Sequence, residues 1–305
     1  MHMNQRQSDT SESDIANGKT ADLGKEMNTT AGLYLDLIKR CLTNSIYGES
    51  EFTPISDCGL VRTLVLKWCA SRGLHIVRKR YDPRVREEGR DRPVTAHTMI
   101  GLKRLDNLQY CVEDVLARGV PGDLIETGVW RGGATIFMRA ILQAHAAKDP
   151  IVWVADSFEG LPPPDPEKFP LDAGDRHHTR KELAVSLEQV KANFACYGLL
   201  DDQVRFLKGW FRDTLPNAPI RQLAVLRLDG DMYESTMEAL VNLYPKLSVG
   251  GYAIVDDYCN IPGCRQAVHD YRQTHDVTEE IMPIDQWGVF WRKIQQACPA
   301  LSIPH

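Results

Sequence analysis

The sequence lacks long hydrophobic runs and an excess of positive charge. No stretch approaches the roughly 20 apolar residues that a transmembrane helix requires, and residues 1–29 are polar, without the apolar centre of a secretion signal. The formal net charge is -5, which disfavours binding to nucleic acid or to an anionic membrane, because both need a concentrated basic surface. We therefore expect a cytoplasmic protein that acts on a small molecule.

A paired cysteine framework is also missing. The eight cysteines are spread along the chain, and only Cys259 and Cys264 lie close together in sequence. No second pair and no His-x-x-x-His partner completes the four ligands of a structural zinc site. The thiols are predicted to be reduced, and neither disulfides nor zinc is expected.

The length and composition suit one α/β domain with an added helical segment: 305 residues, 43% hydrophobic and 25% charged. Between residues 30 and 92, apolar side chains at helical spacing predict helices over 31–42 and 60–71. The charged run 78–92 is interpreted as a solvated loop, and the alternative is a mobile flap near a binding site. The expected organisation is a disordered tail over 1–29, a helical lid or N-terminal extension over 30–92, a catalytic domain over 93–295 and a C-terminal tail over 296–305.

From residue 98 onward, helical and strand-like segments alternate, which is typical of a parallel sheet with crossover helices. Short apolar runs without alternation predict strands that are covered on both faces. The predicted fold is a doubly wound α/β domain, with the N-terminal helical segment over one edge. The expected strands are 123–126, 151–155, 204–207, 223–228 and 252–255, and the expected helices are 99–118, 134–147, 180–197 and 234–247.

A glycine-rich turn follows the first predicted strand. Its sequence, from Glu126 to Gly133, is Glu-Thr-Gly-Val-Trp-Arg-Gly-Gly. The glycines permit a tight turn, and the N-terminus of the next helix favours a bound carboxylate. The spacing does not match the G-x-G-x-x-G of dinucleotide enzymes, but it is similar to motif I of S-adenosylmethionine methyltransferases. A purely structural turn is the alternative.

The second predicted strand ends at Asp156, followed by Ser-Phe-Glu-Gly-Leu-Pro. An acidic residue at this position is placed to accept hydrogen bonds from both ribose hydroxyls of a nucleoside cofactor. A helix-capping role for Asp156 is the alternative. Because two successive strands end in such residues, each interpretation supports the other.

Four carboxylates follow two further strands of the predicted sheet. Asp229 and Asp231 are separated by one glycine and point the same way in an extended segment, and Asp256 and Asp257 follow the apolar run 252–255. Adjacent strands would bring all four to one edge of the sheet, where they would repel each other unless a positive group lay among them. Oxygen ligands without His or Cys favour Mg²⁺.

Motifs along residues 34–293 resemble the macrocin O-methyltransferase (TylF-like) family. They include the turn at Glu126, the Asp-Ser-Phe-Glu-Gly at Asp156, the Lys-Gly-Trp-Phe at 208–211, the Leu-Asp-Gly-Asp-Met-Tyr at 228–233 and the Val-Asp-Asp-Tyr at 255–258. The resemblance implies a Rossmann-like class I fold, a homo-oligomer, and N-terminal helices that cover the active site. It further implies that Asp229, Asp256 and Asp257 bind the metal and that Asp231 is the general base. The cofactor-binding residues expected from the motifs are Thr98, Met99, Glu126, Thr127, Gly128, Val129, Trp130, Asp156, Ser157, Phe158, Glu159, Gly160, Gly209, Trp210, Phe211 and Asp229.

The function implied is Mg²⁺-dependent transfer of a methyl group from S-adenosyl-L-methionine to a sugar hydroxyl of a macrolide or aminocoumarin type natural product. Two alternatives stay open: a phosphatase-like hydrolase that uses the Asp-x-Asp segment, and a methyltransferase-fold binding module without catalysis. His177, His178 and His269 are candidates for a second base or a substrate contact, with surface or structural roles as the alternative.

Overall fold

The computed structural model describes residues 29–47, 52–55, 60–79 and 81–295. The tails predicted over 1–29 and 296–305 therefore lie outside the described residues, apart from Thr29. Across the described part, no helix combines the length and the apolar character needed to cross a membrane.

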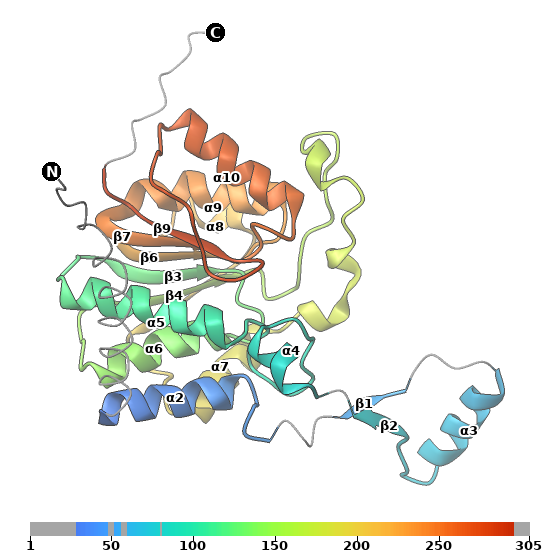
Figure 1. The fold of residues 1–305 in the computed structure, drawn as a ribbon. Helices are drawn as coiled ribbons and strands as arrows, with labels where there is room; N and C mark the ends of the chain where they lie inside the picture. The colour runs from blue at the N-terminus through green and yellow to red at the C-terminus, as the bar shows by residue number, and fades with distance from the viewer. Residues whose placement is uncertain (1–28, 48–51, 56–59, 80, 296–305) are drawn as a thin grey trace, which may run out of the picture.

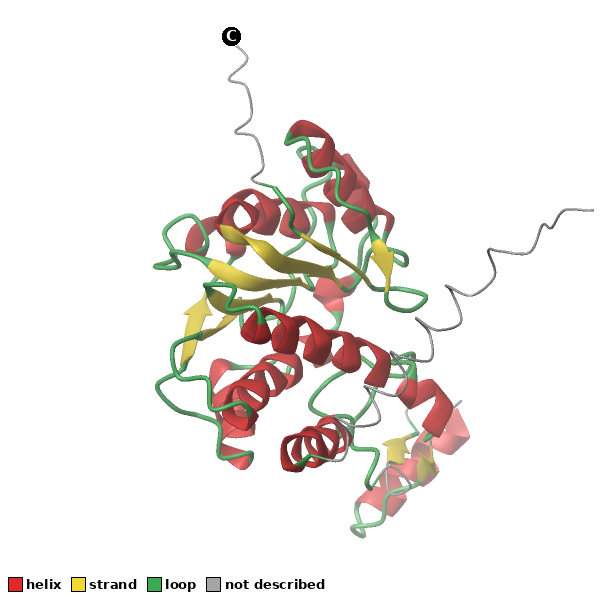
Figure 2. Ribbon diagram, turned by 60° about the vertical axis from the view of Figure 1, so that its left-hand side comes forward, coloured by secondary structure: helices red, strands yellow, loops and turns green. Residues whose placement is uncertain are grey.

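A seven-stranded sheet forms the centre of the molecule (Figures 1 and 2), with the strand order β5-β4-β3-β6-β7-β9-β8. The strands from β3 to β7 are parallel, and they coincide with the five predicted runs, although β7 begins earlier than expected. The antiparallel strands β8 and β9 were not predicted. The bounds are β3 Asp123–Thr127, β4 Val152–Asp156, β5 Val204–Lys208, β6 Leu223–Leu228, β7 Leu247–Val255, β8 Met282–Pro283 and β9 Val289–Arg292.

Helices cover both faces of the sheet (Figure 1) and enclose two separate cores. Because side chains alternate along a strand, Leu124 enters the first core and Ile125 the second. This explains why the strands read as unbroken apolar runs. The first core is closed by α2 (Thr30–Leu42), α5 (Leu102–Ala117), α6 (Gly133–Ala144) and α7 (Leu187–Cys196), and the second by α9 (Tyr233–Leu243) and α10 (Pro262–Thr274).

The strand order reverses between β3 and β6. From β3 the chain adds β4 and β5 on one side, and then returns to add β6 and β7 on the other. Ligands of open α/β sheets bind beyond the carboxyl ends of the strands at such a switch point. Apart from Thr98 and Met99, the predicted site residues lie at the ends of β3 to β7 or shortly after them, and so they are at this end of the sheet.

The N-terminal extension divides into parts with different surroundings. Helix α2 packs on α6 and contributes Leu35 and Leu42 to the first core. The hairpin of β1 (Phe52–Pro54) and β2 (Val77–Lys79), with α3 (Leu60–Ala70) between them, projects away from the sheet (Figure 1). Trp68 on α3 is 54% exposed, and the homo-oligomer that could cover such a surface stays a prediction.

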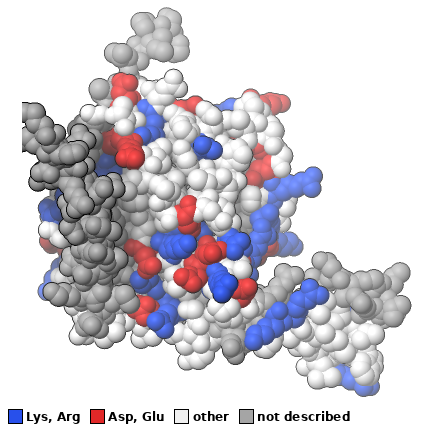
Figure 3. Space-filling view, in the orientation of Figure 1, with Lys and Arg blue, Asp and Glu red and all other residues white. Residues whose placement is uncertain are grey.

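The charged run 78–92 contains more structure than the predicted loop. It includes the end of β2 and the short helix α4 (Pro83–Glu87), which Asp82 caps through the N–H groups of Arg84 and Val85. Its charges pair locally, as between Arg86 and Asp91 at 2.7 Å, and positive and negative side chains are intermixed around α4 in Figure 3. Residues 89–92 line a cavity at the switch point, so this run also contributes to the candidate site.

The helix expected over 180–197 begins only at Leu187, where Ser186 accepts a hydrogen bond from the N–H of Gln189 at 3.2 Å. Before it, the chain forms three short 3-10 turns: η2 (Pro170–Asp172), η3 (His177–Thr179) and η4 (Lys181–Leu183). A cap at Ser186 stops the helix from extending backward. Several residues of the segment 157–186 line the cavities at the switch point.

Candidate active site

The turns after β3, β4 and β6 are locked together. Gly128 has φ +85°, and a Cβ placed on it would lie 1.8 Å from the carbonyl oxygen of Asp229, so only glycine fits. The carboxylate of Asp156 accepts hydrogen bonds from the N–H of Val129 at 2.8 Å and of Phe158 at 2.7 Å. Asp156 therefore fixes two turns. Each of its oxygens can accept more than one hydrogen bond, which leaves capacity for ribose hydroxyls.

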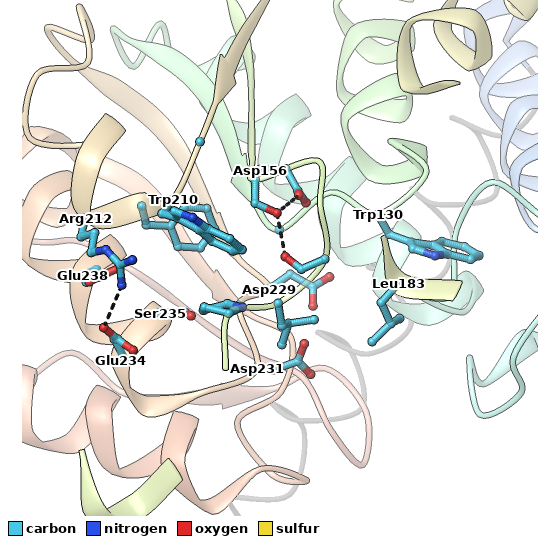
Figure 4. Close-up of a pocket in the computed structure, with 18 of the residues that line it drawn as sticks. Trp130, Asp156, Leu183, Trp210, Arg212, Asp229, Asp231, Glu234, Ser235 and Glu238 are labelled. Atoms are coloured by element: carbon cyan, nitrogen blue, oxygen red, sulfur yellow. Dashed lines mark hydrogen bonds and ion pairs between the residues drawn. The ribbon is translucent and has the colours of Figure 1, made fainter. Parts of the chain in front are cut away.

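The first cavity lies between these turns and the start of α9. In Figure 4, Trp210 and Trp130 lie on opposite sides of it, with Asp229 and Asp231 between them. Aromatic side chains on two sides, with carboxylates between them, suit a ligand that has both a flat apolar part and a polar part. Ten predicted cofactor-binding residues line this cavity: Met99, Gly128, Trp130, Asp156, Ser157, Gly160, Gly209, Trp210, Phe211 and Asp229.

The other predicted cofactor-binding residues lie elsewhere. Thr98, Glu126 and Val129 line a neighbouring cavity. Thr127 is buried in β3 with its hydroxyl toward the carbonyl of Arg227, and Phe158 is buried in the first core. The exposed Glu159 donates its N–H to the hydroxyl of Ser157 at 2.9 Å, so neither it nor the two buried side chains lines either cavity.

Three of the predicted carboxylates converge. Oxygen atoms of Asp229, Asp256 and Asp257 all lie within 4.8 Å of one another, with Asp256 and Asp257 nearly buried. The register of β6 and β7 brings them together, since the N–H of Asp256 donates to the carbonyl of Leu228 at 2.9 Å. The Oδ2 atom of Asp257 is buried without a hydrogen-bond partner among the described residues. A buried carboxylate oxygen without a donor is costly, and a hard cation would satisfy it.

Two arginines that the sequence analysis did not single out lie within the same cluster. Arg227 is 1% exposed and donates to Asp229 at 2.7 Å, and it also binds Asp256 and Glu126. Arg104, from α5, binds Asp256 on its other side. The positive charge that the carboxylates require is thus supplied in part by the protein itself.

The acidic groups still outnumber the arginines. Arg104 also pairs with Asp285 at 3.1 Å, and the charge of Arg180 lowers the pKa of Asp231, so three guanidinium groups face six carboxyl groups. If all were ionised, their net negative charge would favour binding of a dication beside Asp257, which forms no ion pair with Arg227 or Arg104 among the described residues. The six are Glu126, Asp229, Asp231, Asp256, Asp257 and Asp285.

Four of these groups, Glu126, Asp229, Asp231 and Asp257, have pKa values raised by burial and therefore resist ionisation. Burial and the nearby charges of Asp229 and Asp175 raise the pKa of Asp231 to about 8. Burial also raises the pKa of Glu126 to about 8, against the lowering effect of Arg227. A positive ion among these groups would lower their pKa values again, which would convert Asp231 into an ionised carboxylate at neutral pH.

These shifts predict how the stability of the metal-free protein depends on pH. For Asp231 the folded state holds a proton that the unfolded state releases between pH 3.8 and about 8, so this group's contribution to the free energy of unfolding falls as pH rises through that window. Thermal unfolding in chelator should show a lower Tm at pH 8 than at pH 6. Asp231→Asn should flatten part of this slope; an unchanged slope would contradict the assignment.

A second cavity, of about 500 Å³, adjoins the first. Residues 89–94, Trp287 and Asn260 line it, together with Asp256 and Asp257. The two cavities share Met99, Trp130, Leu183, Asp229 and Asp231. A ligand in each would therefore meet at Asp229 and Asp231, beside the carboxylate cluster.

The strand order, the glycine turn after the first parallel strand and the acidic turn after the second define the Rossmann-like fold of S-adenosylmethionine-dependent methyltransferases. A solved structure entitled as that of the O-methyltransferase NovP is 50% identical, with a TM-score of 0.77 over 87% of this chain and 100% of that one. A calicheamicin methyltransferase, CalS11, shares the fold at 18% identity and a TM-score of 0.52, over 78% of this chain and 95% of that one.

The chain belongs to the macrocin-O-methyltransferase (TylF) family, whose model matches residues 31–293. Mycinamicin III 3''-O-methyltransferase of Micromonospora griseorubida is 51% identical over 87% of this chain and 98% of that protein. Demethyldecarbamoylnovobiocin O-methyltransferase of Streptomyces niveus is 50% identical over 89% and 97%. A Streptomyces olivaceus 4'-O-methyltransferase that acts on a dimethoxyrhamnosyl tetracenomycin is 56% identical over 88% and 96%. The chain is therefore an O-methyltransferase, and its Asp-x-Asp segment belongs to that fold rather than to a phosphatase-like hydrolase.

Proposed function

We propose that this enzyme transfers a methyl group from S-adenosyl-L-methionine to a sugar hydroxyl of a glycosylated natural product, with Mg²⁺ as its metal. The named relatives support the acceptor class, since they methylate glycosylated antibiotics or their precursors. The observation on which the proposal depends is the convergence of Asp229, Asp256 and Asp257 beside Asp231, where the two cavities meet.

The donor set fits a hard dication. All three side chains offer carboxylate oxygens, and the buried Oδ2 of Asp257 has no hydrogen-bond partner in the described part of the chain. Asp229, Asp256 and Asp257 would hold Mg²⁺, which when bound supplies charge that favours the deprotonated form of a nearby hydroxyl. Arg227 and Arg104 keep Asp229 and Asp256 in place.

The first cavity fits the methyl donor. Asp156 at the end of β4 and Ser157 after it have the position expected for ribose contacts. Trp210 offers an aromatic face, and the turn at Gly128 presents backbone to the amino acid part. The bound donor would supply a methyl group on a positively charged sulfur. The protein's task is to hold this group in line with the acceptor oxygen.

Asp231 is placed to accept the proton of the acceptor hydroxyl. It lines both cavities. It belongs to the turn after β6, where its backbone adopts a left-handed conformation with φ 58°. A positioned base contributes about 10² to 10⁴-fold to rate. Orientation of the two reactants and exclusion of water by the residues around the second cavity would contribute more, roughly 7 to 11 kcal/mol.

The direct test is a methyl-transfer assay with labelled S-adenosyl-L-methionine. Mycinamicin III, demethyldecarbamoylnovobiocin and the demethyl-tetracenomycin glycoside are the acceptors, each with Mg²⁺ and with chelator. The proposal predicts methylation of at least one glycoside, no product from the matching aglycone, and loss of turnover in chelator. Methylation of the aglycones alone, or of no acceptor, would contradict it.

A further inference from the structure

The segment between β4 and α7 is fixed across the switch point at one end by Asp172. This buried side chain accepts hydrogen bonds from the N–H of Tyr233 at 2.7 Å and of Glu234 at 3.0 Å. These groups begin α9, directly after the Asp-Gly-Asp turn at 229–231. The segment is therefore tied to the turn that carries the proposed metal ligand and base.

The other end of the segment is tied to the cofactor turn. The indole N–H of Trp130 donates to the carbonyl oxygen of Glu182 at 2.8 Å, and Leu183 lines both cavities. Residues 173–181 are thus held between two anchors. Their side chains can keep a fixed place relative to the reacting groups.

Between the anchors, Asp175 holds the ring of His177. One oxygen of Asp175 accepts from the backbone N–H of His177 at 2.7 Å, and the other contacts its Nδ1 at 2.6 Å. Because a carboxylate only accepts, Nδ1 carries the proton in this pair, and the neutral ring presents an unprotonated Nε2. The imidazole is therefore oriented as a hydrogen-bond acceptor.

His177 belongs to the wall of the second cavity. His177 lines it together with Asp231, Asp257 and Asn260, and its side chain retains 26% exposure. Among the described residues, no hydrogen bond to its Nε2 occurs. An oriented but unused acceptor, at the wall of a cavity that also contains the carboxylate cluster, is suited to receive a hydroxyl group.

We propose that His177, oriented by Asp175, is an acceptor-binding residue that receives a hydrogen bond from a sugar hydroxyl other than the one methylated. This assignment rests on the proposed function, since it places the sugar in the second cavity. Its consequence is selectivity among acceptor sugars. A sugar with a hydroxyl at that position binds with its methylated hydroxyl beside Asp231, whereas the corresponding deoxy or O-methyl sugar leaves Nε2 without a donor. The neighbouring His178 is exposed and takes no part.

Steady-state kinetics on the glycoside with the highest turnover tests this inference. His177→Ala should raise KM for the glycoside about 3- to 10-fold, the value of one neutral hydrogen bond, with a smaller change in kcat and an unchanged Kd for S-adenosylhomocysteine. His177→Gln, whose amide oxygen can replace Nε2 as an acceptor, should recover part of the loss. His178→Ala is the matched control and should behave as the wild type.

A second readout does not depend on turnover. In ¹⁵N NMR of the full chain with S-adenosylhomocysteine and Mg²⁺, the unprotonated Nε2 of His177 should move upfield when mycinamicin III or another of the three glycosides is added. A wild-type KM in His177→Ala together with an unmoved Nε2 resonance would overturn the assignment. Absence of methyl transfer by the wild type, with the resonance shift present, would instead contradict the proposed function.

Discussion

Replacing Asp231 by Asn should lower kcat about 10² to 10⁴-fold, because the amide cannot take a proton from the acceptor hydroxyl. The substitution preserves shape and removes the negative charge. Asp231 has φ 58°, a left-handed conformation that Asn also tolerates, so the turn should persist. The Kd for S-adenosylhomocysteine should remain near the wild-type value, and isothermal titration measures it.

Asp276 provides a matched control for this variant. It also has a left-handed backbone, with φ 51°, and lies exposed in the turn after α10, away from both cavities. Asp276→Asn should keep full activity, which separates the effect of an Asn in a left-handed turn from the loss of the base. If Asp231→Asn also kept full turnover, another group would have to accept the proton.

Replacing Asp257 by Asn should weaken Mg²⁺ binding by about 100-fold or more, since loss of even an outer partner of a metal ligand costs 10 to 100-fold. Turnover at limiting Mg²⁺ should fall with it. Burial and the neighbouring charges of Asp231 and Asp229 raise the pKa of Asp257 well above its usual value, so the neutral amide should make the metal-free protein more stable above pH 7.

Weaker Mg²⁺ binding together with higher stability of the metal-free variant distinguishes the loss of a metal ligand from simple misfolding. Thermal unfolding with and without Mg²⁺ should show a variant whose Tm is at or above that of the metal-free wild type, and which no longer rises when Mg²⁺ is added. A variant with a lowered Tm that still responds to Mg²⁺ would place the ion away from Asp257.

The sequence was sufficient to predict the parallel sheet and the edge of it at which the candidate site residues gather. The five apolar runs became β3 to β7, because strands covered by helices on both faces need no polar alternation. The glycine turn, Asp156 and the Asp pairs follow these strands, and their convergence follows from the topology. The sequence also contains the pattern of α10, whose Cys264, Ala267, Val268 and Tyr271 have helical spacing and are buried, although this helix was not predicted.

Other features depend on tertiary contacts that local patterns do not encode. β8 has only two residues and pairs with β9 across a hairpin, so neither forms a distinctive run. Arg227 is recognisable in the sequence as a charged residue within an apolar strand. Its three carboxylate partners come from different strands, so the sequence pattern alone does not identify them. The Asp175–His177 pair lies in irregular turns, and only the anchors at Asp172 and Trp130 reveal its place.

The arginines also refine the electrostatic argument for a metal. Close carboxylates need a positive neighbour, and Arg227 and Arg104 meet this need for Glu126, Asp229 and Asp256. They do not meet it for Asp257 or Asp231, whose pKa values stay raised. The expected ion is therefore one that completes an existing network of charges, at the side of the cluster that faces the second cavity.

The most direct test of this account is a titration of the chelator-treated wild-type enzyme with Mg²⁺, followed by calorimetry and by methyl transfer to the accepted glycoside. The account predicts one ion bound per chain and turnover that is lost in chelator and restored along the same binding curve. Undiminished turnover after complete chelation would contradict the claim that Asp229, Asp256 and Asp257 hold a metal on which the reaction depends.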